Sequence, residues 1–243
     1  MSEKGNPYRY NGRFGSPEKY DKILYEPNKD KNIKEADEWR KNKNSEESTS
    51  SAFSTLKETD SETFSKAINK AKQSQADSVK WRVSAYGSEH YKDAKCFKTD
   101  DGSTVAVTDT GDIISVCASG SAIRGTGTKL METAIKNGGT KLDSFSGNHG
   151  FYTKMGFEPI SYTPFSEWAL DDADRIIWKR AKGEPEDVIF YAYVGKENVK
   201  YSGREGLKKF LSEGKKFEGD DGYDKALEYR DKWLKQKGKK YEL

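Results

Sequence analysis

The most restrictive feature of the sequence is an apolar strand that leads through a glycine-rich loop into a helix. Residues Ile113–Ala118 carry no charge, which predicts a buried central strand. Gly120, Gly125 and Gly127 predict a loop, and the helix that we expect next covers Thr128–Lys136. The apolar face of this helix is formed by Leu130, Met131, Ala134 and Ile135. This order of elements is typical of an α/β domain.

The loop has the chemistry of a phosphate site. Glycines let a backbone approach a ligand closely, and the amides at a helix start have no intrahelical partner, so together with the helix dipole they favour an anion. Arg124 and Lys129 add positive charge. The loop lacks the Gly-Lys-Ser/Thr ending of a Walker motif and the third glycine and ribose acid of a dinucleotide fingerprint. A tight turn without a ligand is therefore the alternative interpretation.

The residues before this loop predict one helix and several strands separated by turns. Asp101-Gly102 favours a tight turn between strands Lys95–Thr99 and Ser103–Thr108, and Gly111 marks the next turn. Alternation over Val79–Tyr86 predicts a further strand. Thr59 and Glu62 fit a capping box, and the helix that we expect after it has its apolar face at Phe64, Ala67, Ile68 and Ala71.

The residues after the loop predict two further strands around a short helix. Asn137-Gly138-Gly139 ends the first helix, and a strand is expected over Lys141–Phe145. A short helix over Asn148–Met155 closes at Gly156, and the strand Phe157–Tyr162 follows. A loop containing Pro164, Trp168 and Pro185 then leads to a β-prone run over Val188–Val194.

Composition divides the 243 residues into three parts. Residues 1–50 read as an extended or partly disordered arm, with a short helix expected over Ile33–Lys41 and a Ser/Glu/Thr-rich linker over Ser45–Ser54. Residues 51–194 form the expected α/β domain. Residues 195–243 form a C-terminal extension of two amphipathic helices. Only 33% of the side chains are hydrophobic and 34% are charged, so we expect part of the chain to pack poorly.

Several classes of protein are disfavoured at this point. The sequence has neither a long uncharged apolar run nor a charged leader with an apolar core, so we expect no membrane span and a cytoplasmic location. Residues 51–194 carry 18 basic and 20 acidic side chains, which disfavours a nucleic-acid partner there. Two cysteines, Cys96 and Cys117, and two histidines, His90 and His149, predict reduced buried thiols and no metal site.

A second motif narrows the interpretation. About two dozen residues after the glycine loop stands the run Phe151-Tyr152-Thr153-Lys154-Met155-Gly156-Phe157-Glu158. A glycine loop and helix, a short strand and then Tyr-x-Lys-x-Gly-Phe resembles the GNAT family of acyl-CoA-dependent N-acyltransferases. The resemblance covers roughly Val79 to Val194 and is strongest from Ile113 to Ile160.

The resemblance implies a mixed, splayed sheet flanked by helices, with acetyl-CoA held between two central parallel strands, here Ile113–Ala118 and Lys141–Phe145. A backbone N–H of the first strand would polarise the thioester carbonyl. Asn148 would bond the pantetheine amides. The pantetheine arm would lie along Val116, Cys117 and Ala118, and the pyrophosphate on the amides of Arg124, Gly125, Thr126, Gly127 and Thr128.

The resemblance also implies the reaction, which is transfer of an acetyl group to a primary amine on a small molecule or a protein, without a metal. Tyr152 would protonate the departing CoA thiolate, since a phenol keeps its proton at neutral pH. His149 lies beside it and is a candidate base. The structural alternatives are a half-buried tyrosine without chemistry and a histidine that caps a helix.

The glycine loop departs from the family pattern Gln/Arg-x-x-Gly-x-Gly/Ala. In the register that matches the helix face, Gly125 and Gly127 are the two glycines and Ala122 stands in the Gln/Arg place. The other register uses Arg124 but puts Lys129 where a small residue belongs. We prefer the first register. In this register Arg124 lies two positions after the Gln/Arg place and supplies the missing positive charge. The departure from the family pattern affects the expected affinity for the cofactor.

The sequence indicates less clearly which residues would contact the amine acceptor. Asp143 is a candidate acceptor contact or a strand-end turn residue, Asp112 a turn residue, and His90 and Glu89 surface residues. Phe165, Trp168 and Trp178 would either line an acceptor pocket or cover the sheet. The alternative function is a catalytically degenerate GNAT-like module in a larger assembly, such as a phage assembly, with a protein partner bound by residues 1–50 or by the C-terminal helices.

Overall fold

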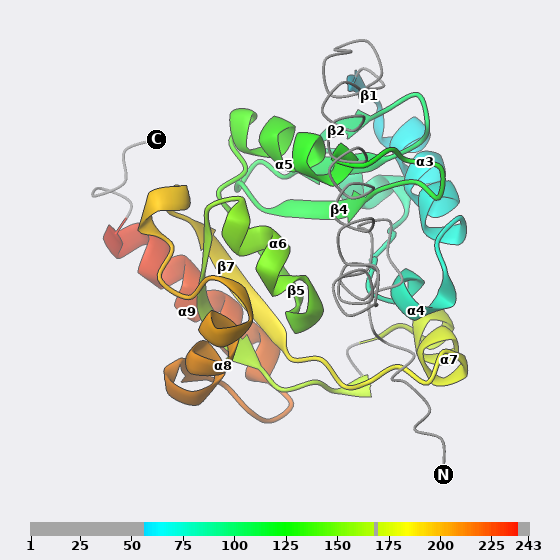
Figure 1. The fold of residues 1–243 in the computed structure, drawn as a ribbon. Coiled ribbons are helices and arrows are strands. Elements are labelled where there is room, and N and C mark those ends of the chain that lie inside the picture. The colour runs from blue at the N-terminus through cyan, green and yellow to red at the C-terminus, as the bar shows by residue number, and fades with distance from the viewer. Residues whose placement is uncertain (1–55, 168–169, 238–243) are drawn as a thin grey trace, which may run out of the picture. The chain divides into compact units, whose positions relative to one another are not determined.

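Glycine turns fold the first half of the domain into an antiparallel sheet. The computed structural model describes residues 56–167 and 170–237 (Figure 1). Gly102 and Gly111 have φ of 87° and 82°, a conformation that glycine adopts without a steric cost. They lie in the turns that follow the second and the third strand of this sheet. The strand order is β1-β2-β3-β4, with every pair antiparallel. These strands are β1 (Lys57–Thr59), β2 (Lys95–Lys98), β3 (Thr104–Val107) and β4 (Ile113–Cys117).

The second sheet places the last long strand in its middle. Its order is β5-β7-β6-β8, and β7 pairs antiparallel with both β5 and β6, while β8 runs parallel to β6. The first five of the six residues of β7 are buried, which explains why the strand carries no charged side chain. These strands are β5 (Lys141–Phe145), β6 (Phe157–Thr163), β7 (Val188–Tyr193) and β8 (Lys215–Lys216).

The two sheets meet at one point. Asp112 and Lys141, at the starts of β4 and β5, form a parallel bridge, and the Lys141 amide donates to the Gly111 carbonyl at 3.2 Å. Beyond this bridge, within the described residues, β4 and β5 belong to different sheets. The helix α5 (Thr126–Lys136) connects them. The neighbouring parallel strands β4 and β5 are therefore bridged where they begin and are not paired further along.

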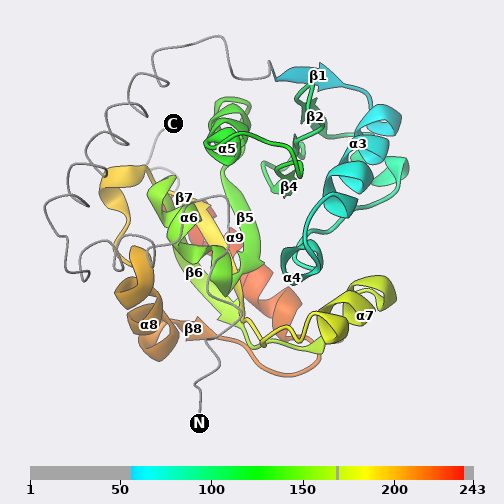
Figure 2. The same ribbon diagram turned by 45° about the vertical axis from the view of Figure 1, so that its right-hand side comes forward.

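Helices cover both faces of both sheets (Figures 1 and 2). On the first sheet, α3 (Ser61–Gln73) covers one face and α5 the other. On the second, α6 (His149–Lys154) and α8 (Gly203–Glu213) lie on one side, and α9 (Gly222–Lys237) on the other. The short helix α4 (Asp77–Lys80) packs against α7 (Asp172–Arg180).

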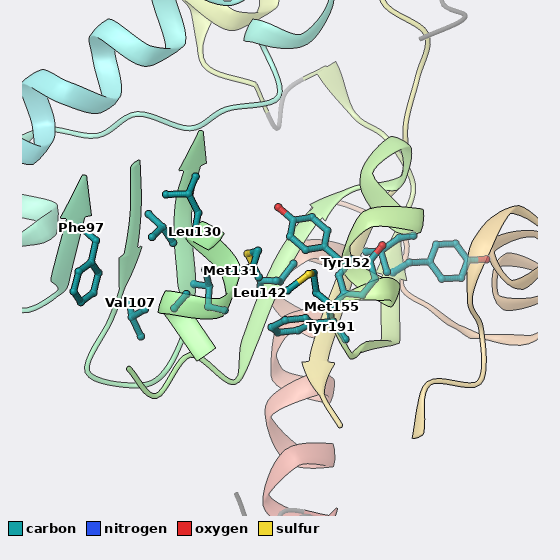
Figure 3. Close-up of a cluster of buried hydrophobic side chains, with 14 of the residues drawn as sticks. Phe97, Val107, Leu130, Met131, Leu142, Tyr152, Met155 and Tyr191 are labelled. Atoms are coloured by element: carbon teal, nitrogen blue, oxygen red, sulfur yellow. The ribbon is translucent and has the colours of Figure 1, made fainter. Parts of the chain in front are cut away.

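One hydrophobic core runs through both sheets. Figure 3 shows Phe97 and Val107 of the first sheet, Leu142 and Tyr191 of the second, and side chains of α5 and α6 in one continuous cluster. Smaller clusters lie under α3 and under α9. Because all the described residues fall in one compact unit, the helices after residue 195 pack as part of the same domain.

The C-terminal helix is fixed where the sheets meet. The side chain of Arg230 on α9 is fully buried, and its Nη2 lies 2.8 Å from Asp112 Oδ1 and 2.9 Å from Asp231 Oδ1. Lys141 Nζ lies 3.1 Å from one carboxylate oxygen of each of the same two aspartates. This cluster of two cations and two carboxylates, which we call the junction cluster, ties α9 to β4 and β5.

The structure confirms most of the predicted elements and corrects three. The hairpin, β4 to β7 and both C-terminal helices are as expected. The predicted strand over Val79–Tyr86 is wrong, because α4 ends at Lys80 and Trp81 then turns inward to pack on Phe145 at 4.9 Å. The capping box is also wrong, since Asp60 caps α3 and accepts from the Thr63 amide at 2.8 Å. Helix α7 lies inside the predicted loop.

The strand β1 was not predicted. It occupies the edge of the first sheet, beside β2. The predicted arm over residues 1–50, with its helix over Ile33–Lys41, lies outside the described residues, and so does the predicted linker over Ser45–Ser54.

Candidate functional site

The strand β4 contains a β-bulge that separates its two faces. Ser115 has φ of 53°, and the register with β3 shifts beside it. Ile114 packs with the cluster under α3, whereas Ile113 and Val116 pack toward α5. The Ser115 hydroxyl lies 2.8 Å from Tyr91 Oη, on the α3 side. The predicted pantetheine residue Val116 therefore lies on the α5 side of the strand, next to the core cluster that contains Tyr152.

The loop after β4 is docked on the end of α3. The Gly120 amide donates to Ser74 Oγ at 2.7 Å, and the side-chain amide of Gln75 donates to the Ala118 carbonyl. A Cβ at Gly120 would approach the Ser74 carbonyl oxygen to 2.5 Å, so glycine is required there by close packing. Ala118 is one of the residues predicted to lie along the pantetheine arm, and its carbonyl already accepts a hydrogen bond from Gln75.

Helix α5 begins two residues earlier than predicted, at Thr126, after Gly125 with φ of 91°. Within the described residues, four of the five amides predicted to bind the pyrophosphate donate no hydrogen bond; the fifth, that of Thr126, donates to Ile123 O at 3.2 Å. Those four amides belong to Arg124, Gly125, Gly127 and Thr128. Free amides at a helix start are the groups that an anion needs.

Tyr152 lies in the core cluster between α6 and the second sheet. Its ring centroid is 5.7 Å from that of Tyr191 and 5.2 Å from that of Phe151. Burial raises the pKa of Tyr152 to about 12, and the hydrogen bond with the Ser144 side chain acts in the opposite direction. The phenol is therefore fully protonated at neutral pH, as a proton donor must be.

Ser144 links the predicted site residues and was not among them. Asn148 Nδ2 donates to Ser144 Oγ at 3.0 Å, and the same hydroxyl contacts the Tyr152 phenol. Alternation along β5 was the available signal, because Leu142 and Ser144 share the face toward Tyr152 while Asp143 points to the other.

His149 joins α6 to its surroundings. The side chain is buried, with 1% exposure, and both ring nitrogens have partners. Nε2 lies 2.6 Å from the Tyr201 carbonyl, which can only accept, so Nε2 carries the proton. Nδ1 then accepts from the Tyr191 hydroxyl at 3.2 Å. This arrangement suits a residue that holds α6 and β7 together, and the role of base stays a prediction.

The burial of His149 predicts a pH dependence of stability. Burial lowers the pKa of His149 below its ordinary value, and the Tyr201 carbonyl partly offsets this effect. The unfolded chain then binds more protons than the folded one as pH falls below the ordinary histidine value, so the contribution of His149 to stability is full above about pH 6.5 and is lost below it. In His149→Gln, we expect a smaller loss of Tm between pH 7.5 and 5.5 than in the unsubstituted chain, measured by circular dichroism. An equal loss in both proteins would contradict this account.

A second group of side chains lies on the opposite face of β5. Asp143 lies inside the strand, not in a turn after it, opposite Phe190 of β7. The Tyr223 hydroxyl of α9 donates to its carboxylate. The pKa of Asp143 is raised because protein atoms surround its carboxyl group, although Arg230 lowers it and part of the residue reaches solvent.

The other acceptor-side candidates separate into two sets. His90 and Glu89 are exposed in the turn Ser88–Tyr91, as expected. Phe165 and Trp178 stack at 5.0 Å and join Trp81 and Phe145 in one aromatic cluster, while Trp168 lies outside the described residues. Both cysteines are free and buried, as predicted, and burial raises the pKa of Cys96 to about 11.

Comparisons with known proteins give no assignment. No protein-family model, no curated protein and no solved structure matches the chain. The part of the chain that the structure describes contains no group of three His, Cys, Asp or Glu residues placed to hold a metal ion. None of its helices has the length and apolar character that a bilayer crossing requires.

Proposed function

We propose that the chain is a GNAT-like N-acetyltransferase that moves an acetyl group from acetyl-CoA to a primary amine. The observation that carries the proposal is the pair β4 and β5, two parallel neighbours bridged only at Asp112 and Lys141. Their facing edges beyond the bridge offer backbone groups to an extended ligand, and α5 begins at the far end of β4. A strand-like pantetheine arm that ends in a diphosphate fits this arrangement.

The donor would be held by main-chain groups and one cation. The free amides at the start of α5 would bind the diphosphate, and Arg124 would add charge. Val116 lies on the α5 side of the bulge, where its N–H would polarise the thioester carbonyl. Asn148 would meet the pantetheine through the side of α6 that also carries Tyr152.

The chemistry requires one nucleophile and one proton donor. The amine nitrogen, once deprotonated, forms a C–N bond with the thioester carbonyl carbon. The C–S bond breaks with its electron pair on sulfur, and the thiolate takes the Tyr152 proton, which solvent restores to the phenolate. Ser144 and Asn148 orient the phenol for this transfer.

The test of the donor site is Gly127→Glu. A Cβ at Gly127 would meet only the Phe151 ring, at 3.5 Å, so the fold accommodates a side chain there. The new carboxylate would lie beside the amides proposed to bind the diphosphate and would repel it. We expect acetyl-CoA affinity, measured by titration calorimetry, to fall roughly 10-fold or more.

The matched control is Gly87→Glu. A Cβ there meets nothing within 4 Å, and the residue lies in a turn on the α3 side. We expect its acetyl-CoA affinity to equal that of the unsubstituted chain. Equal affinity in Gly127→Glu would place the diphosphate elsewhere.

The second candidate function is a GNAT-like module that has lost catalysis. Two observations favour it. The Gln75 side chain already donates a hydrogen bond to the Ala118 carbonyl, and Ala122 stands where the family has Gln or Arg. Pantetheine would have to displace Gln75 from that carbonyl. Absence of acetyl-CoA binding by both the unsubstituted chain and Gln75→Ala would favour the module over the enzyme.

A further inference from the structure

The backbone at the end of β4 turns one carbonyl away from its neighbour β3. The Ser119 amide donates to Ser103 Oγ at 2.9 Å, and Ser103 directly precedes β3. In a trans peptide the carbonyl and the following N–H point in opposite directions, so the Ala118 carbonyl points away from β3. Among the described residues β4 is the last strand of its sheet. The carbonyl therefore lies on the side of β4 that is unpaired beyond the bridge with β5, which we call the open edge of β4.

A side chain of the protein itself already binds this carbonyl. The side-chain amide of Gln75, a residue that follows α3, donates to the Ala118 carbonyl. Cys117 Sγ lies 3.6 Å from the same oxygen, but a thiol is only a weak donor. A glutamine carboxamide presents the same kind of N–H as the secondary amides of an extended chain. Gln75 thus makes the hydrogen bond that a strand-like ligand would make with the open edge.

The backbone around Gln75 is held in place. The Gly120 amide donates to Ser74 Oγ at 2.7 Å, and the Gln75 amide donates to the Lys72 carbonyl at 3.1 Å. The side chains of Lys72 and Asp174 form a buried ion pair, with Nζ 2.6 Å from Oδ2, which ties the end of α3 to α7. Release of the carbonyl on the open edge therefore requires a rotation of the Gln75 side chain and no movement of α3.

The contact of Gln75 is weak enough for a ligand to displace it. A neutral hydrogen bond contributes little net free energy, because water replaces it when it breaks, and a fixed glutamine side chain also loses rotamer freedom. Gln75 is half-buried, so its side chain can turn toward solvent. Such a contact changes a binding constant by about 3- to 10-fold. It would therefore weaken the binding of a ligand at the open edge without preventing it.

We propose that Gln75 is an intramolecular competitor for the open edge of β4, which covers the Ala118 carbonyl until a ligand with a secondary amide displaces it. The identity of that ligand, the pantetheine arm of acetyl-CoA, rests on the proposed function, while the closure by Gln75 stands on the contacts of the free protein. An extended ligand without an amide N–H at this position cannot replace the lost hydrogen bond. The contact therefore favours amide-bearing chains over other extended ligands.

The first test measures the closure without acetyl-CoA. The probes are N-methylacetamide, a secondary amide, and N,N-dimethylacetamide, which lacks the N–H, added to the full chain labelled with ¹³C. At equal concentration we expect N-methylacetamide to shift the NMR signal of the Ala118 carbonyl at least about 3-fold more in Gln75→Ala than in the unsubstituted chain. N,N-dimethylacetamide should shift it in neither. Gln73→Ala, which changes an exposed glutamine at the end of α3, is the matched control and should behave as the unsubstituted chain.

The second test separates the pantetheine arm from the diphosphate. Titration calorimetry compares acetyl-CoA, S-acetylpantetheine and ADP on the same proteins. We expect Gln75→Ala to raise the affinity for acetyl-CoA and for S-acetylpantetheine by a similar factor, about 3- to 10-fold. ADP carries a diphosphate and no pantetheine, so its affinity should not change. Gln73→Ala should change none of the three.

Three results would overturn the competitor role, provided that thermal melts show Gln75→Ala folded. They are equal N-methylacetamide shifts in Gln75→Ala and the unsubstituted chain, equal measurable affinities of both for acetyl-CoA, and a gain for ADP as large as that for acetyl-CoA. The last would mean that the substitution acts through the glycine loop. Absence of acetyl-CoA binding in every variant, together with the expected N-methylacetamide shifts, would refute the proposed acetyltransferase and leave the closure by Gln75 standing.

Discussion

Replacing Tyr152 by phenylalanine is expected to lower the rate of acetyl transfer about 100-fold or more without weakening acetyl-CoA binding. The substitution removes the proton that the CoA thiolate would receive and leaves the ring in its contacts with Phe151 and Tyr191. Loss of the hydrogen bond with Ser144 should cost only about 1 kcal/mol of stability. The measurement is kcat from acetyl-CoA consumption with primary amines, alongside calorimetric binding of acetyl-CoA.

The control is Tyr229→Phe, which removes the same atom from a partly exposed tyrosine on α9. We expect its kcat to equal that of the unsubstituted chain. Because the pKa of Tyr152 is about 12, its ionisation should cause no loss of rate up to about pH 10. An unchanged kcat in Tyr152→Phe would assign the proton to another donor and leave Tyr152 as a packing residue.

Local signals were sufficient for the elements that the sequence predicted well. The strands β4 and β7 are uncharged because both their faces are buried, and the turns at Gly102, Gly111 and Gly156 need a positive φ that glycine supplies. These features depend on neighbours in the chain, so they are readable without a structure.

The elements that we predicted wrongly from the sequence depend on contacts between residues that lie far apart in the chain. The alternation of Val79, Trp81 and Val83 matched a strand, but Trp81 packs on Phe145 of the second sheet, and Arg82 pairs with Glu186 more than a hundred residues away. The edge position beside β2 is taken by β1 instead. Neither partner could be identified from a local pattern.

The residues of the candidate site also fall into those that a local motif predicts and those that only long-range packing brings together. The glycine loop, Asn148 and Tyr152 come from contiguous motifs, and the structure places Asn148 and Tyr152 on the two sides of Ser144. Tyr223 follows from no motif, because the helix that carries it reaches Asp143 only through the packing of α9 on the second sheet.

Replacing Arg230 by methionine is expected to lower the free energy of unfolding by about 3–5 kcal/mol, since the change leaves partly buried carboxylates without their guanidinium partner. Arg230 Nη2 and Nε contact Asp112 and Asp231, and Lys141 alone would remain to balance them. Typical domains have only about 5–15 kcal/mol in total. The loss corresponds to a Tm lower by roughly 6–20 °C in a thermal melt.

The matched control is Lys232→Met on the same helix, where the side chain is exposed and pairs only loosely with Glu228 at 3.4 Å. We expect a change within about 0.5 kcal/mol. Adding Asp112→Asn and Asp231→Asn to Arg230→Met should restore part of the loss, because the penalty comes from unpaired charge and not from packing. A triple variant no more stable than Arg230→Met would contradict this explanation. In the sequence, Arg230 reads as one more charge on a solvated basic helix; its burial follows only because α9 crosses the place where β4 and β5 share their single bridge.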